Sequence, residues 1–241
     1  MAVVTSLTDS QSSHQTTVST ITFTALGIGA AQASRIVFVN AGFQTTTGPF
    51  ISSASIQGIA ATMVSDGNSP NAATSDKWFY AAVPTGTTGD VIVNLSASTT
   101  IDISIVVYSV TGSSSNPVLS CASNKNAGGN TASLGSVVVK AGGAVIASGT
   151  GGETAGTVSS TWTTLNKDYD VSLSLTSTFP PLQEGRTTAS LLTASDSSVS
   201  VSYTSSASGV VMTVLVLVPD VVTIPESMST MIFQQNRMIV Y

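Results

Sequence analysis

Apolar residues in this chain come in short runs that alternate or cluster, and no segment has the 3.6-residue periodicity of an amphipathic helix. Ser, Thr, Val and Gly are abundant, and all four are poor helix formers. Residues 101–109 (IDISIVVYS) begin with strict alternation that places Ile101, Ile103 and Ile105 on one face, and residues 199–204 (VSVSYT) alternate likewise. The chain is therefore restricted to folds built from short β-strands.

Turn-forming residues separate these runs at the intervals expected of a β-sandwich, for example at Gly142-Gly143 and Gly151-Gly152. We expect strands at residues 19–26, 34–40, 53–56, 60–65, 77–82, 90–95, 101–109, 136–139, 144–148, 161–166, 171–176, 199–204 and 210–218. This series predicts an all-β protein: a two-sheet antiparallel β-sandwich, jelly-roll-like, with an extended C-terminal arm. An immunoglobulin-like Greek key is the alternative, although the chain lacks the Cys–Trp–Cys signature of true immunoglobulin domains.

Composition divides the chain into three parts. Residues 1–18 are polar and predict an N-terminal arm or edge strand, residues 19–218 form the sandwich domain, and residues 219–241 form the C-terminal arm. The first residues have neither a basic leader nor an apolar stretch, so we expect no signal peptide. The most apolar run, residues 210–218, is far shorter than the roughly 20 residues of a membrane-spanning helix and predicts a core strand.

Charge is scarce in this sequence. Charged residues make up 8% of the chain, against about 25% in a typical globular protein. The net charge is −5 and no cluster of Lys or Arg occurs, so we expect no nucleic-acid partner. Weak repulsion between copies makes self-association a reasonable expectation.

The residues needed for common catalytic and metal sites are missing or isolated. His14 is the single histidine, in a polar segment where we expect it to be solvated, so no Ser-His-Asp triad is predicted. Cys121 is the single cysteine, and we expect it to be a small buried apolar residue. One cysteine and one histidine leave no zinc site of the usual type. Asp168 and Asp170 would face the same side of a regular strand and could bind calcium, but turn and edge roles explain them better. We therefore expect no cofactor, no metal and no enzymatic activity.

Three aromatic residues, Trp78, Tyr80 and Trp162, are candidates for stacking on a sugar ring. Because Trp78, Phe79 and Tyr80 are consecutive, strand alternation sends Trp78 and Tyr80 to one face and Phe79 to the other. One of those faces must be core. Packing in the core is the competing interpretation for all three candidates.

The order of segments resembles a recurrent β-sandwich module of tailed-bacteriophage and prophage virion proteins, over roughly residues 15–218. The resemblance is carried by TFTALGIGAAQASRIVFVNAGF (22–43), SSASIQGIAATMV (52–64), WFYAAVPTGTTGDVIVNLSAS (78–98), AGGAVIAS (141–148) and TWTTLNKDYD (161–170). Its most specific parts are the strand pair at residues 55–62 and the turn and strand at residues 83–93. The module brings no catalytic residues, so none are transferred to this chain.

The resemblance implies a location on the exterior of a phage particle. The first functional hypothesis is a non-enzymatic accessory structural protein, such as a head decoration, a head spike or a tail-attached piece, whose partners are copies of itself and other virion proteins. The alternative is a receptor-binding module of a tail fibre or tail tip that recognises a bacterial surface glycan for host attachment. An enzyme such as a depolymerase has the least support. Nucleic-acid binding and membrane insertion are not expected.

The C-terminal arm differs in character from the rest of the chain. Pro219 and Pro225 interrupt the last strand, and the segment SMSTMIFQQNRMIVY follows. We predict that this arm docks on a neighbouring subunit, although a return to its own sheet is equally consistent with the pattern. Burial of five apolar side chains could contribute on the order of 7–15 kcal/mol before ordering costs. These are Met228, Met231, Ile232, Phe233 and Ile239.

Overall fold

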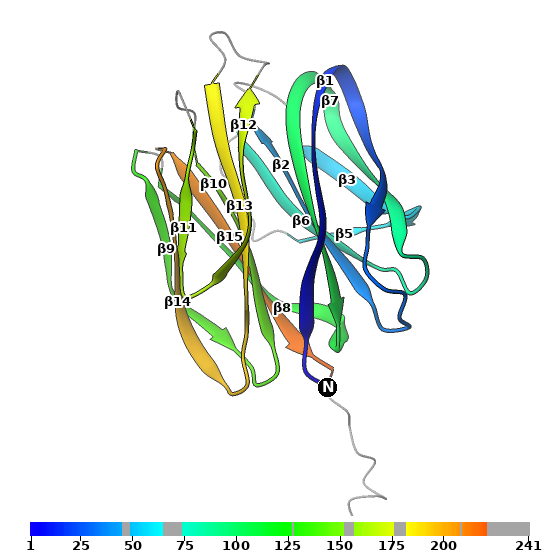
Figure 1. Cartoon of the computed structure of the whole chain (residues 1–241), viewed down its shortest axis with the longest axis vertical. Coiled ribbons are helices and arrows are strands. Elements are labelled where there is room, and N and C mark those ends of the chain that lie inside the picture. Colours follow the sequence, from blue (N-terminus) through cyan, green and yellow to red (C-terminus); the bar gives the residue numbers. More distant parts are fainter. Residues whose placement is uncertain are drawn as a thin grey trace, which may run out of the picture.

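The computed structural model describes residues 1–44, 49–64, 74–126, 128–151, 157–175, 182–207 and 209–220. These residues contain fifteen β-strands and no helix, so the predicted all-β, sandwich-like fold class is confirmed (Figure 1). Among the described residues, no helix is long and apolar enough to cross a membrane. The apolar run at residues 210–218 lies in a buried strand, β15, as predicted.

The strands form three sheets, where the strand spacing predicts two. Sheet A contains β1 (Val4–Gly27), β2 (Ile36–Gln44), β3 (Ile51–Ile56), β4 (Ile59–Ala60), β5 (Thr62–Val64), β6 (Thr74–Ala82) and β7 (Thr88–Thr111). Sheet B has the order β12 (Asn166–Leu175), β13 (Leu182–Leu192), β10 (Ala144–Thr150), β15 (Val210–Pro219) and β8 (Ser113–Asn126). Sheet C has the order β11 (Ser160–Thr163), β14 (Ser197–Ser205) and β9 (Thr131–Val139).

Sheet A folds back on itself because two of its strands are unusually long. The 24-residue strands β1 and β7 pair antiparallel along their whole length. The first part of β7 also pairs with β3, and its second part pairs with β2. The ribbon bends near Thr17, which has a positive φ of 52° and lies at a register shift. The two halves of sheet A enclose a core of their own. Sheet B therefore packs on the outside of sheet A, and a third sheet covers the other face of sheet B.

Sheet A packs its outer face against sheet B. Ile36 and Phe38 of β2 and Tyr108 of β7 lie in this second core, against Ile146 of β10 and Leu215 of β15. The odd-numbered residues of β7 from Ile101 to Val107 point into the core enclosed by sheet A. The alternation read from the sequence at residues 101–109 therefore separates two cores and leaves neither face of this half of β7 to solvent.

Sheet B is covered on both faces, because sheet C packs against its other side. Val145 and Ala147 of β10 point towards sheet C, whereas Ala144 and Ile146 point towards sheet A. Tyr203 of β14 lies in the core between sheets B and C. Figure 1 shows sheet C on one side of sheet B and sheet A on the other.

The polar N-terminal segment is part of sheet A. Residues 4–18 lie in β1, which continues to Gly27, so the boundary expected at residue 18 falls inside a strand. Near the opposite end of the described chain, the amide of Asp220 donates to the carbonyl of Gly112. The chain therefore leaves β15 at the same end of the molecule as the N-terminus (Figure 1). Of the arm expected at residues 219–241, Pro219 is the last residue of β15 and Asp220 follows it. Residues 221–241, with the five predicted docking residues, lie outside the described residues.

Candidate functional site

A chain of buried and partly buried hydrogen bonds crosses from sheet A to sheet B. The indole Nε1 of Trp78 in β6 donates to Oγ of Ser148 in β10 at 2.9 Å. Ser148 in turn donates to Oδ2 of Asp76, also in β6, at 2.5 Å, and Nδ2 of Asn40 donates to Oδ1 of the same carboxylate at 2.8 Å. The Asp76 carboxylate is thus held by donors from β2 and β10.

A second polar contact joins the same two sheets. The hydroxyl of Tyr108 in β7 donates to Oδ2 of Asp168 in β12 at 2.7 Å and lies 2.8 Å from the hydroxyl of Thr188 in β13. Burial raises the pKa of Tyr108 above its ordinary value, and the negative charge of Asp168 raises it further. Tyr108 is therefore held as a neutral donor between the sheets.

His14 has a partner in the structure, although its polar surroundings in the sequence predict a solvated residue. Its Nδ1 lies 2.8 Å from Oδ1 of Asp102, and the register of β1 and β7 places the two residues directly opposite one another. The His14 side chain is 41% exposed and that of Asp102 is 9% exposed. The pair supplies two of the three members of a catalytic triad, and it also provides a partner for a nearly buried carboxylate.

Asp168 and Asp170 do not face the same side, which corrects the sequence-based expectation. A register shift between Lys167 and Tyr169 places a bulge at Asp168 and breaks the alternation of β12. Asp168 contacts Tyr108, whereas Asp170 accepts from Lys167 Nζ at 2.6 Å and from Ser160 Oγ at 3.0 Å. Among the described residues, no group of three or more acidic, His or Cys side chains could hold a metal ion.

The three aromatic candidates for glycan contact lie in different surroundings. Trp78 is 0% exposed, so its ring has no free face on which a sugar could stack. Tyr80 is half-buried and stacks on Phe38 with a centroid distance of 5.1 Å. As alternation predicts, Trp78 and Tyr80 share the face towards sheet B, and Phe79 points into the core of sheet A.

Trp162, the third aromatic candidate, sits at the boundary between sheets B and C. Its ring packs on Tyr203 at 5.0 Å between centroids, and its Nε1 donates to Oγ1 of Thr187 at 3.1 Å. The side chain is half-buried, with its polar atom directed inwards. Trp162 and Trp78 belong to two different cores and do not form one platform.

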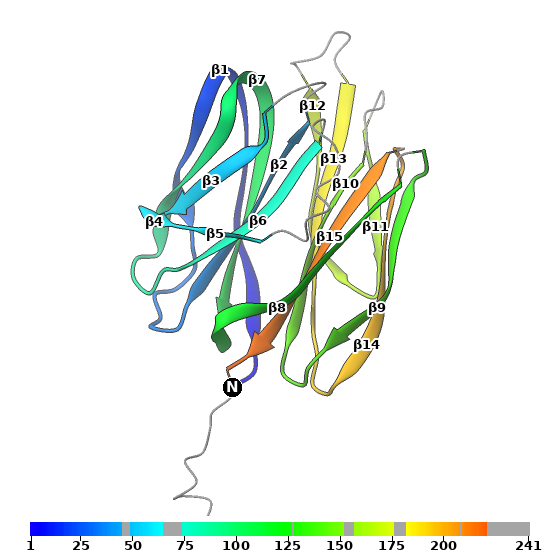
Figure 2. The ribbon, with the colours of Figure 1, turned by 180° about the vertical axis from the view of Figure 1, so that it is seen from behind.

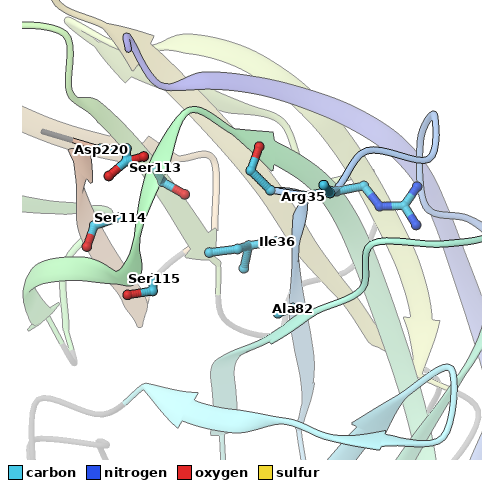
Figure 3. A pocket seen from close by; sticks show the side chains of 9 residues that line it. Arg35, Ile36, Ala82, Ser113, Ser114, Ser115 and Asp220 are labelled. Atoms are coloured by element: carbon cyan, nitrogen blue, oxygen red, sulfur yellow. The ribbon is translucent and has the colours of Figure 1, made fainter. Parts of the chain in front are cut away.

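A pocket of about 330 Å³ lies where the loop before β2 meets the start of β8. Ser113, Ser114, Ser115 and Asp220 line one side of it (Figure 3). Arg35 contributes to the wall, but its guanidinium points away from the pocket. The guanidinium is fully buried, where it donates to the carbonyls of three loop residues, and this burial lowers its pKa. The three acceptors are Gly29, Val83 and Thr85.

An apolar groove of about 320 Å³ runs between β8 and β9. Its floor includes Val137, Val214 and Val216, which belong to the core between sheets B and C. Leu119 and Val138 line it as well and are 51% and 54% exposed. Sequence reasoning missed this surface because β8 was not among the predicted strands.

The fold and these contacts define an all-β, sandwich-like module whose sheets are joined by buried polar side chains. The chain matches no protein-family model, no curated protein and no solved structure.

Proposed function

We propose that this chain is a non-enzymatic accessory structural protein of a phage virion surface that acts by docking and self-assembly. One observation carries the non-enzymatic part of the proposal. Among the described residues, the carboxylates of Asp76 and Asp168 and the imidazole of His14 are each engaged in hydrogen bonds between strands. A general base must reach the proton that it removes from its substrate. Asp76 and Asp168 lie between sheets A and B, where hydrogen bonds hold their carboxylates.

The character of the surface supports the assembly part of the proposal. Seven basic and twelve acidic residues in 241 leave a surface dominated by hydroxyl and amide groups. Copies with so little charge repel one another weakly. The groove between β8 and β9 adds an exposed apolar area beside two strands that lie at sheet edges among the described strands, which is a typical docking surface.

Support for the location on a virion comes from the sequence resemblance at residues 15–218. The sandwich-like architecture is compatible with that resemblance. Many symmetric copies would multiply weak contacts into stable attachment.

The alternative, a receptor-binding module that recognises a bacterial glycan, has less support. It needs exposed aromatic faces, and Trp78 offers none. Tyr80 and Trp162 are half-buried and packed on other rings.

The test is the copy number of the protein in purified particles of the phage that encodes it, measured by quantitative mass spectrometry. Hundreds of copies per particle would support head decoration, and a few to a few dozen would support a spike, fibre or tail position. Absence from purified particles would overturn the proposal. Binding of the purified protein to isolated host cell-surface glycan, measured by calorimetry, would favour the alternative.

A further inference from the structure

Two strand edges lie side by side at one side of the sandwich formed by sheets B and C. β8 pairs only with β15, and β9 pairs only with β14, among the described strands. Both strands line the groove of about 320 Å³, and Figure 2 shows them at the same side of the molecule. Each therefore presents a row of backbone groups that an additional strand could pair with.

On this side, β8 and β9 are bridged in the upper half, near Asn124 and Asn126, and leave the groove open in the lower half, near Leu119. In the upper half, two asparagines of β8 bridge to carbonyls of β9: Asn124 Nδ2 donates to Ser133 at 2.5 Å and Asn126 Nδ2 donates to Thr131 at 2.9 Å. In the lower half the groove is open. There the register shift between Val216 and Leu217 leaves Leu119 opposite no residue of β15, as a bulge. The exposed apolar surface is thus confined to the half that the asparagines do not close.

We propose that this open half is the docking site for the C-terminal arm, residues 221–241, of a second copy of the chain. The arm would add a strand between β8 and β9 and cover the exposed side chains of Leu119 and Val138. This inference rests on the proposed assembly function and assigns its contact surface.

The composition of the arm matches the groove. Residues 228–241 contain one charged residue, Arg237, and two apolar triplets, MIF at 231–233 and MIV at 238–240. Ile, Phe, Val and Tyr favour extended strands that pack on an apolar surface. The groove is lined by Leu, Val, Ala and Ser and by no charged residue. An apolar segment exposed in a chain with so few charges would otherwise promote aggregation.

The length of the arm favours a second copy over its own groove. Val216 lines the groove and lies only four residues before Asp220, where the described chain ends. Ten residues, 221–230, precede the first apolar triplet, and an extended chain of that length spans about 33–36 Å. A return to the groove of the same molecule would need a much shorter connection than this. The spacer is long enough to reach a neighbouring molecule.

Disulfide trapping between two full-length chains tests the contact. One chain carries Cys121→Ala with Leu119→Cys, and the other carries Cys121→Ala with Phe233→Cys or, for the opposite face of the added strand, Ile232→Cys. Cys121 is the only native cysteine, so each chain has a single thiol. We expect a disulfide-linked heterodimer on mild oxidation of the mixture. A chain with both introduced cysteines that forms only an internal disulfide at all concentrations would overturn docking in trans.

Paired charge substitutions in the full-length chain supply a matched control. Leu119→Glu places a carboxylate at the groove, and Leu192→Glu makes the same change at the end of β13, where the leucine is 52% exposed, against 51% for Leu119. We expect Leu119→Glu to weaken self-association roughly tenfold or more and Leu192→Glu to leave it unchanged. Circular dichroism and the melting temperature check folding, and Val138→Glu replaces Leu119→Glu if that variant does not fold.

The outcomes separate this inference from the proposed function. If the chain assembles and is found in particles, but Leu119→Glu behaves as Leu192→Glu does and no interchain disulfide forms, the groove assignment is wrong and the proposed function stands. If the unmodified chain is monomeric at every concentration and absent from particles, both are wrong. Interchain trapping together with selective loss of assembly in Leu119→Glu supports both.

Discussion

The hydroxyl of Tyr108 in β7 donates a hydrogen bond to the carboxylate of Asp168 in β12, with 2.7 Å between the oxygens, and this contact joins sheet A to sheet B. It depends on the bulge at Asp168, because regular alternation would turn that side chain to the opposite face of β12. Together with the bond from Trp78 to Ser148, it gives the otherwise apolar interface polar contacts with defined partners. Such contacts favour one relative position of two sheets over others.

We predict that Tyr108→Phe lowers the free energy of unfolding by about 1–3 kcal/mol, because Asp168 and Thr188 lose a hydrogen-bond partner at a buried interface. Tyr80→Phe is the control, since that half-buried ring stacks on Phe38 and should lose less than about 0.5 kcal/mol. Urea titration followed by circular dichroism measures both. Equal effects of the two substitutions would show that the contact does not stabilise the fold.

The raised pKa of Tyr108 predicts a specific alkaline pH dependence. The tyrosine of the unfolded chain ionises near pH ~10, whereas the buried one stays neutral to higher pH. Its contribution to stability is complete below pH ~10 and is lost as the pH rises above that value, because ionisation then favours the unfolded state. The unfolding free energy of the wild type should therefore fall more steeply than that of Tyr108→Phe as the pH rises above about 10. Identical slopes would contradict this.

Ser148→Ala should destabilise the protein by about 1–3 kcal/mol, because it removes the acceptor of the buried Trp78 N–H and a donor to Asp76. Ser98→Ala, at an exposed position of β7, is the matched control and should stay within about 0.5 kcal/mol of the wild type. Thermal and urea unfolding provide the measurement. If Ser148→Ala is as stable as Ser98→Ala, the hydrogen-bond chain between the sheets carries no net stability.

His14→Ala should lower the unfolding free energy by no more than about 1 kcal/mol, because its partner contact with Asp102 is partly exposed to water. Assembly and particle association should be unchanged, as they should be in the control Gln11→Ala on the same strand. The purified protein should also release no reducing sugar from host polysaccharide. Reproducible cleavage that is lost in His14→Ala would contradict the non-enzymatic assignment.

The sequence predicts the fold class and most strands, but it does not predict the strands whose apolar pattern is weak. β8 (SSSNPVLSCASNKN) and β13 are polar or small-residue segments that are held in place by pairing with the apolar strands β15 and β10. Residues 96–100 (SASTT) fall between the predicted strands 90–95 and 101–109, yet they lie within β7, because β1 pairs with β7 on both sides of them. Long-range pairing overrides local propensity in these segments.

The contacts between sheets were even less accessible to sequence reasoning. Trp78 and Ser148 are 70 residues apart and belong to different sheets, so no local pattern links them. The bulge that redirects Asp168 has no signature in the sequence, where Asp168 and Asp170 simply alternate. The even–odd pattern of Trp78, Phe79 and Tyr80 did predict which side chains share a face, because alternation within one strand is a local property.

The proposed docking of the C-terminal arm is tested by the molar mass in solution of the full chain and of a chain that ends at Asp220. Multi-angle light scattering coupled to size exclusion gives the mass, and circular dichroism confirms that the shorter chain keeps its β-structure. We predict oligomers for the full chain and a folded monomer for the shorter one. A folded, shortened chain that forms the same oligomers as the full chain would show that the arm does not hold the copies together.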